Sequence, residues 1–258
     1  KAGDFPDWLI PAIITDLKLR DMKSLENNES RASKFVDAFI LDIPWDDYIG
    51  KTDRLASITK EQVVAFANAN FNNNYLVVYK KTGKNEGIDK IKKPKITKIE
   101  INRDSKSEFL SMMETRTVAD IEPVFIDYQN DIKHLKVNGS VPLHYVQNRE
   151  NQTFDLYYVY ELGSDHDLKL ALAVEYLKYL GTSEFTPEAM KQEFFKLGCT
   201  YNVNVGDDEV WVNLSGLSEN MPRALDLFEN LLANPVENQE AMTNLVNAGP
   251  RTLATLGD

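Results

Sequence analysis

The chain has little cysteine, little histidine and no excess of basic charge. Among its 258 residues there are one cysteine and three histidines. A single thiol, Cys199, excludes an internal disulfide and a cysteine-rich metal site. The formal charge of −11 at pH 7 disfavours nucleic acid or an anionic membrane as the main partner. No run approaches the roughly 20 apolar residues of a membrane span, and a glycine-rich phosphate loop is missing.

The rest of the composition is typical of a folded protein. Hydrophobic residues make up 43% of the chain and aromatic residues 10%, which argues against disorder of the whole chain. The length suits two modest domains or one large one. The chain starts at Lys1 without a methionine and stops at Asp258 after a run that looks helical. We therefore expect it to be a segment of a longer polypeptide.

The first 80 residues predict three helices and one strand. Apolar residues at helical spacing predict a helix over residues 7–25. A second helix is expected from Asn28 or Ser30 to Pro44, and a turn with aromatic anchors over residues 45–55. Thr59 and Gln62 have capping-box spacing for a third helix, and residues 75–80 favour a buried strand. The expected inner face of the second helix consists of Phe35, Val36, Phe39 and Ile40.

Residues 81–104 are rich in lysine and poor in apolar side chains. This composition predicts an extended linker, with a basic patch for an acidic ligand as the less favoured alternative. Ser105 or Ser107 is expected to cap a short helix that runs to Val118.

The stretch that organises the second half is residues 168–198, which predicts two helices. The first, residues 168–180, is apolar nearly all round and is expected to be buried, with Ser164 and Asp167 at capping-box spacing and Gly181 as a left-handed C′ residue. The second begins with Thr186 as N-cap and a proline at its first position, and ends at Gly198. Its apolar face is expected to consist of Met190, Phe194 and Leu197.

Four strands accompany this helix pair. Residues 141–147 and 154–162 predict one hairpin, and residues 200–205 and 210–214 predict another. A helix beginning at Ser218 and a further one near Glu237 follow. The order β-β-α-α-β-β-α-α predicts an α+β fold, an antiparallel or mixed sheet with helices packed on one face.

This order resembles the M16 (insulinase- and pitrilysin-like) zinc metallopeptidases. In that family a helix carries His-x-x-Glu-His, followed by Gly-Thr, a helix begun by proline and ended by Leu-Gly, and a β-hairpin. The corresponding stretches here are residues 172–176, 181–182, 186–188 and 196–198. Residues 53–81 resemble the end of another such repeat, and the resemblance implies an M16/LuxS-like metallohydrolase repeat.

The resemblance also implies that this segment lacks the zinc site. Leu172 and Tyr176 occupy the two histidine positions, and leucine has no lone pair for zinc. Glu175 is not expected to act as a base without a metal-bound water, so a helix carboxylate near a cation is the favoured interpretation. We expect no catalytic, metal-binding or cofactor-binding residue in this segment, with zinc held elsewhere in the parent protein.

The resemblance divides the chain into residues 1–82, the C-terminal part of one repeat; 83–138, an interhalf linker; and 139–258, the N-terminal part of a further, non-catalytic repeat. The expected function is the non-catalytic half of a clamshell chamber that encloses peptide substrates, with the catalytic half of the same parent chain as partner. A wholly inactive scaffold or peptide-binding subunit, and an unrelated α+β protein, are the alternatives. Bacterial relatives suggest the periplasm or cell envelope.

Three other groups of residues were considered as sites. A cluster at Asp165, His166 and Asp167 is more consistent with helix capping. The acids at residues 207–209 lack the spacing of a calcium loop. Cys199 has no neighbouring histidine to activate it and suits a small core position. The tryptophans are expected to be packing anchors: Trp8, Trp45 and Trp211.

Overall fold

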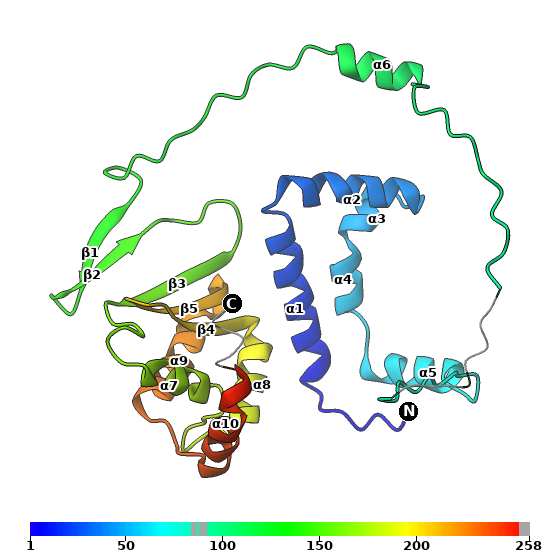
Figure 1. The fold of residues 1–258 in the computed structure, drawn as a ribbon. Coiled ribbons are helices and arrows are strands. Elements are labelled where there is room, and N and C mark those ends of the chain that lie inside the picture. The colour runs from blue at the N-terminus through cyan, green and yellow to red at the C-terminus, as the bar shows by residue number, and fades with distance from the viewer. Residues whose placement is uncertain (84–86, 88–91, 253–258) are drawn as a thin grey trace. The chain divides into compact units, whose positions relative to one another are not determined.

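A computed structural model describes residues 1–83, 87 and 92–252, and only the helical backbone of residues 248–252 (Figure 1). The chain divides into two compact units. One contains Lys1–Asn73 and the described part of Gln147–Asp258, and the other is Asn74–Val146. No described helix is long and apolar enough to cross a membrane.

The first unit is built on a three-stranded antiparallel sheet. The strands are β3 (Thr153–Tyr160), β4 (Cys199–Val205) and β5 (Val210–Leu217), in the spatial order β3-β5-β4. Leu156 and Tyr201 both lie opposite Leu214 in the register. Because successive side chains of a strand point to opposite faces, Leu156, Tyr201 and Leu214 share the face that carries the core.

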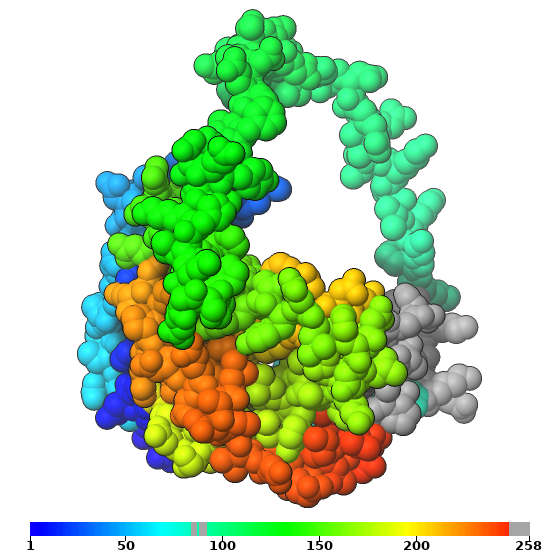
Figure 2. Space-filling view, turned by 90° about the vertical axis from the view of Figure 1, so that its left-hand side faces the viewer, coloured from blue at the N-terminus to red at the C-terminus, as the bar shows by residue number. Residues whose placement is uncertain are grey.

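Two helices lie between β3 and β4 in the chain, α7 (Lys169–Leu177) and α8 (Pro187–Leu197), and two follow β5, α9 (Met221–Ala233) and α10 (Gln239–Thr252). All four lie on one side of the sheet in Figure 1. A short 3-10 helix, η1 (Ser218–Asn220), precedes α9. Figure 2 shows the outer surface of this layer, where the segments coloured from lime to red lie side by side. The predicted α+β fold with an antiparallel sheet and helices on one face is confirmed.

The core lies between this sheet and these helices. Its largest fully buried side chains are Phe228, Met190, Leu214, Leu217 and Leu231. The Phe228 ring lies 5.0 Å from the ring of Tyr201, which in turn lies 5.0 Å from that of Phe194. Truncating a fully buried phenylalanine to alanine costs about 3–5 kcal/mol. This cluster therefore supplies much of the stability of the unit.

Two glycines around α8 show different constraints. Gly198 ends the helix with φ of 57°, a left-handed conformation that glycine adopts without steric cost, and this confirms the predicted C-terminus. Gly181 has no positive φ, so its predicted left-handed role is wrong. A Cβ at Gly181 would lie 2.2 Å from the carbonyl oxygen of Phe185. Close approach of the backbone, not helix termination, explains glycine at this position.

Helix α7 is shorter and more exposed than predicted. It spans Lys169–Leu177, and none of its residues is fully buried. The predicted burial on all sides is wrong because α7 packs mainly against β4 and α10, and Leu172 on its surface is 38% exposed. The predicted capping role of Ser164 is wrong, since the N-cap residue is Leu168, which makes no side-chain capping hydrogen bond, and the Ser164 hydroxyl bonds Asp207 instead. Asp167 nevertheless accepts a hydrogen bond from the Lys169 backbone N–H at 2.8 Å.

Helix α1 (Leu9–Ser24) packs against α8 and touches β3. The Lys196 ammonium lies 4.8 Å from the centre of the Trp8 ring. A Cβ at Gly198 would lie 2.7 Å from the Thr15 methyl group. Close packing thus joins α1 to α8.

The helix that follows α1 exposes the apolar side chains that were expected to form its inner face. Helix α2 (Asn28–Ile40) is capped by Asn27, not by Asn28 or Ser30. Its residues Phe39 and Ile40 are 85% and 70% exposed. The predicted inner face is wrong for the described chain because α2 packs mainly on the short helix α3 (Trp45–Ile49), where Phe35 stacks on Trp45.

The predicted turn over residues 45–55 is wrong. The chain forms α3 and then α4 (Lys51–Ala56) there, with acidic residues in the first turn of each that interact favourably with the helix dipole. The capping box of α5 (Lys60–Asn70) is confirmed, since Thr59 and Gln62 form both hydrogen bonds. Phe66 on this helix is 62% exposed.

The second unit contains α6 (Glu108–Thr115) and a hairpin of β1 (Lys133–Val137) and β2 (Val141–Tyr145). Ser107 caps α6 as predicted. The predicted pairing of residues 141–147 with 154–162 is wrong. Asn138 and Gly139 both have positive φ, so an Asn-Gly turn folds β2 back onto β1, and β3 pairs with β5.

The predicted strand over residues 75–80 is wrong for the described chain. The stretch has no assigned secondary structure, and Leu76 is 89% exposed. A strand requires a neighbouring backbone for its hydrogen bonds, and none of the described strands pairs with this stretch. Of the predicted linker, residues 84–86 and 88–91 lie outside the described residues.

Candidate functional site

The position that resembles a zinc-peptidase motif lies on α7, at the edge of the core. Leu172 is 38% exposed and Tyr176 is half-buried and packs against the core cluster. The two residues are four apart on one helix, so they lie on the same face. Leu172 has no atom that can bind a metal ion, so this face offers at most the phenolic oxygen of Tyr176.

Tyr176 has a specific partner. Its hydroxyl oxygen accepts a hydrogen bond from the backbone N–H of Asn238 at 2.7 Å. Asn238 immediately precedes α10, and its side-chain oxygen accepts from the Ala241 N–H at 3.0 Å. The Asn238 amide also donates to the carbonyl oxygen of Tyr179 at 3.3 Å. Tyr176 therefore fixes the start of α10 against α7.

Glu175, which occupies the position of the family's general base, forms an ion pair on the surface. Its carboxylate lies 2.6 Å from the Lys178 ammonium, three residues along the helix. Both side chains are more than a third exposed, so the pair contributes less than about 1 kcal/mol to stability. This is the arrangement of a helix carboxylate beside a cation that the sequence favoured.

The Asp165, His166 and Asp167 cluster does not converge on one point. The His166 Nδ1 atom accepts a hydrogen bond from the Gly163 N–H at 3.2 Å, whereas Asp167 caps the Lys169 N–H. The Asp165 N–H donates to the carbonyl oxygen of Asp207 at 3.0 Å. The loop is therefore docked by its backbone against the turn between β4 and β5.

The acids of that turn also act locally. The Asp207 carboxylate accepts a hydrogen bond from the Ser164 hydroxyl at 3.5 Å, and Glu209 accepts from the Trp211 indole N–H at 2.8 Å. A Cβ at Gly163 would lie 2.0 Å from the Asp207 carbonyl oxygen. The contact between the two loops therefore requires glycine at position 163.

Cys199 is buried, with 6% exposure, at the start of β4. Burial raises the pKa of its thiol to about 11, because desolvation disfavours the thiolate. A thiol with a raised pKa is a poor nucleophile at neutral pH. The core role predicted for Cys199 agrees with this position.

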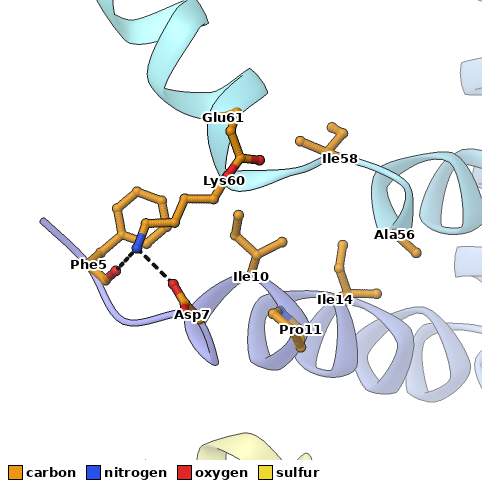
Figure 3. Close-up of a pocket in the computed structure, with 9 residues that line it drawn as sticks. All are labelled: Phe5, Asp7, Ile10, Pro11, Ile14, Ala56, Ile58, Lys60 and Glu61. Carbon is orange, nitrogen blue, oxygen red and sulfur yellow. Dashed lines mark hydrogen bonds and ion pairs between the residues drawn. The ribbon is translucent and has the colours of Figure 1, made fainter. Parts of the chain in front are cut away.

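An open groove of 530 Å³ lies in the first unit between the start of α1 and the α4–α5 connection. Figure 3 shows Ile10, Ile14 and Ile58 converging on its apolar floor. The described residues at the rim of the groove include charged ones: Lys60 lies beside Asp7, and Glu61 is nearby. Sequence reasoning missed this groove because its walls come from segments about 50 residues apart.

The charges at the rim largely neutralise one another. The Lys60 ammonium lies 2.8 Å from the Asp7 carboxylate and donates to the Phe5 carbonyl oxygen at 2.7 Å. The hydrogen bond from Lys60 holds the pKa of Asp7 below its usual value. A hydrogen bond from its own backbone N–H, together with one from Thr59, lowers the pKa of Glu61. The groove thus offers an apolar floor and a rim whose ionised side chains include the Lys60–Asp7 ion pair.

Two of the three histidines come together in the second unit. His134 and His144 lie directly opposite each other on β1 and β2. Their spacing carried a signal, because each lies five residues from Gly139 of the Asn-Gly turn. No group of three histidine, cysteine or acidic side chains capable of holding a metal ion occurs among the described residues.

Comparison with solved structures finds a peptidase inactive domain and two proteases. The chain is similar to a peptidase M16 inactive domain from Pseudomonas fluorescens, with 24% identity over 45% of this chain and a TM-score of 0.41. It is similar to a protease from Helicobacter pylori, with 14% identity over 46% of this chain and a TM-score of 0.41. The periplasmic protease PqqL from Escherichia coli shares 12% identity over 96% of this chain, with a TM-score of 0.43.

The chain spans 30–31% of the length of these proteins. No protein-family profile matches the chain, and no curated protein matches it. At these identities and TM-scores the likeness carries no argument about activity. The function must be argued from the residues.

Proposed function

We propose that this chain is a non-catalytic part of a zinc-dependent M16-type peptidase and contributes a wall of the chamber that encloses peptide substrates. Residues 139–258 would form most of a non-catalytic repeat, residues 1–82 the end of the preceding repeat and residues 83–138 the linker between halves. Zinc and the catalytic residues would belong to the other half of the parent chain. Peptide or unfolded polypeptide would be the substrate.

The observation that carries this proposal is that a residue at a metal-ligand position of α7, Tyr176, forms a hydrogen bond to the start of α10. The sequence frame places Leu172 and Tyr176 at the metal-ligand positions, and the Tyr176 hydroxyl is engaged by the Asn238 N–H. A zinc hydrolase needs three protein ligands and an open position for water. Here the position of the second imidazole serves the packing of α10, which is consistent with a repeat kept for its shape.

The open face of the sheet supports a role in contacting peptides. Tyr157, Val159 and Trp211 lie on the face opposite the core and are 43–55% exposed. The Tyr157 and Trp211 rings meet edge to face, with centroids 6.2 Å apart. β3 and β4 are the outer strands of the described sheet. An extended peptide can add to an outer strand through backbone hydrogen bonds, with little dependence on its sequence.

The exposed face of α2 supports the assignment of residues 1–82 to a larger repeat. Phe35, Val36, Phe39 and Ile40 are each more than half exposed. Monomeric proteins seldom leave such a cluster of large apolar side chains in water. A further layer of the same parent protein packed against this face would bury it.

The proposal is tested with the purified chain and an unstructured peptide of about 25 residues. We expect binding, with NMR shift changes in β3, β4 and the Trp211 indole, and no cleavage with or without added Zn²⁺. The control is the same peptide N-methylated at alternate residues, which cannot complete the backbone hydrogen bonds and should not bind. Equal binding of both peptides, or cleavage by this chain alone, would contradict the proposal.

The parent sequence separates the peptidase from an inactive scaffold. An intact His-x-x-Glu-His with a downstream glutamate in the other half, and loss of peptidase activity when its glutamate is replaced by glutamine, would support the peptidase. Absence of that motif throughout the parent would overturn the hydrolytic part of the proposal.

A further inference from the structure

The His134 and His144 side chains form a cross-strand pair on the β1–β2 hairpin. The two residues are partners in the strand register, and both are exposed. Their Nδ1 atoms lie 2.9 Å apart, and the rings are nearly perpendicular, with centroids 4.9 Å apart and an interplanar angle of 82°. In this arrangement one neutral ring donates and the other accepts a single hydrogen bond.

The separation of the two nitrogen atoms matches a particular coordination geometry. Bonds of about 2.0 Å from a metal ion to two imidazole nitrogens at a right angle place those nitrogens about 2.8 Å apart, close to the observed 2.9 Å. A tetrahedral ion requires a separation of about 3.3 Å with the same bond length. The pair is therefore better spaced for neighbouring positions of a square-planar or tetragonal ion, for which Cu²⁺ and Ni²⁺ are typical.

We propose that His134 and His144 form a binding site for one divalent transition-metal ion, Cu²⁺ being the best fit. The ion would replace the hydrogen bond between the rings, and water would complete its coordination. Imidazole nitrogen is a suitable ligand for copper, and Cu²⁺ binds most tightly among the divalent first-row ions. This inference does not depend on the proposed peptidase function.

The hairpin holds the two ligands in place before any ion binds. Lys133–Tyr145 and Val137–Val141 pairs fix the register on either side of the histidines, and the Asn138–Gly139 turn closes the strands. A two-stranded hairpin is marginally stable on its own. A ligand that binds the folded hairpin more tightly than the open chain stabilises it, so the metal should fasten the two strands together.

One nearby charge opposes binding. Lys136 is two residues from His134 on β1, so it lies on the same face of the strand. A cation near the site repels a divalent ion, although exposure to solvent screens the effect. We therefore expect an exchangeable ion, and tighter binding when this lysine is replaced by glutamine.

The test adds Cu²⁺ alone to the full chain after removal of metal with a chelator, measured by calorimetry and electron paramagnetic resonance. We expect one site per chain with nitrogen hyperfine structure from two imidazoles. H134Q and H144Q should each weaken binding at least tenfold. H166Q is the matched control, because His166 is also exposed but belongs to the other unit and is not a register partner of either histidine, and it should bind as the unaltered chain does.

Binding that changes less than twofold in H134Q and H144Q, or that is lost in H166Q, would refute the site. Backbone NMR shifts of β1 and β2 verify that the variants keep the hairpin. A K136Q variant should bind about two- to threefold more tightly, and weaker binding would contradict the geometry described. Stoichiometric Zn²⁺ that survives the H134Q and H144Q substitutions would instead oppose the proposed non-catalytic role of α7, so the two proposals fail separately.

Discussion

Replacing Tyr176 by phenylalanine tests the role assigned to the motif helix. The substitution keeps the ring that packs on the core and removes the oxygen that accepts from the Asn238 N–H at 2.7 Å. A net hydrogen bond contributes about 1 kcal/mol, and a donor left without a partner costs about 1–3 kcal/mol. Because both residues are half-buried, water can partly replace the lost acceptor. We expect Y176F to lower the free energy of unfolding by about 1 kcal/mol.

The assay is urea unfolding followed by fluorescence, together with amide hydrogen exchange. Y176F should accelerate exchange at Asn238 and in the first turn of α10 while leaving β5 unchanged. Y179F is the matched control, because Tyr179 is 43% exposed and contacts Asn238 through its backbone carbonyl. It should change the stability by less than about 0.5 kcal/mol. Equal effects of the two substitutions, or undisturbed exchange in α10, would refute the reasoning.

Three further substitution or labelling results are expected. F228A should destabilise the first unit by about 3–5 kcal/mol in urea unfolding because Phe228 is fully buried, whereas F39A, at an exposed position, should change stability by less than about 0.5 kcal/mol; similar losses would show that α2 is buried in solution. Cys199 should react with a thiol reagent about a hundredfold more slowly at pH 7 in the folded chain than in the unfolded chain, since burial raises its pKa from 9.0 to about 11, and rapid labelling would contradict its core position. The double variant L172H/Y176H should gain Zn²⁺ affinity of at least tenfold over the unaltered chain in calorimetry, because histidines four residues apart share a helix face; no gain would count against the alignment of α7 with the family motif.

Local signals in the sequence predicted the elements well. Short-range hydrogen bonds or backbone conformations mark the helix boundaries at Thr186 with its following proline, at Thr59 with Gln62, and at Gly198. The alternation over residues 200–214 fixed the β4–β5 hairpin for the same reason. These signals act within a few residues of the chain, so no knowledge of the tertiary structure was needed.

The errors concern contacts between distant segments. Residues 75–80 have the composition of a strand, but composition does not supply a partner. Phe39 lies on an apolar face of α2, and that face is covered only if another layer is present. The predicted hairpin turned at the longer loop that follows β2. The β1–β2 hairpin, which turns at Asn138–Gly139, was therefore not predicted.

The candidate site was predictable only in part. Reading Leu172 and Tyr176 in the frame of a metallopeptidase motif located the helix, and Glu175 has the neighbouring cation that was expected. The hydrogen bond from the Asn238 N–H to the Tyr176 hydroxyl joins residues that are 62 positions apart in the sequence. No local pattern therefore predicts it. The groove beside Lys60 and the His134–His144 pair likewise depend on segments that meet only after folding.

The unpaired stretch over residues 75–80 has a consequence for synthesis. None of the described strands pairs with it, so strand pairing within the described chain does not cover it at any stage of synthesis. A run of β-branched and aromatic side chains is therefore available for stacking with identical runs on neighbouring nascent chains. The positive charges of Lys80 and Lys81 at its end oppose such stacking, as gatekeeper residues do, and neutralising both should increase fibril formation during expression.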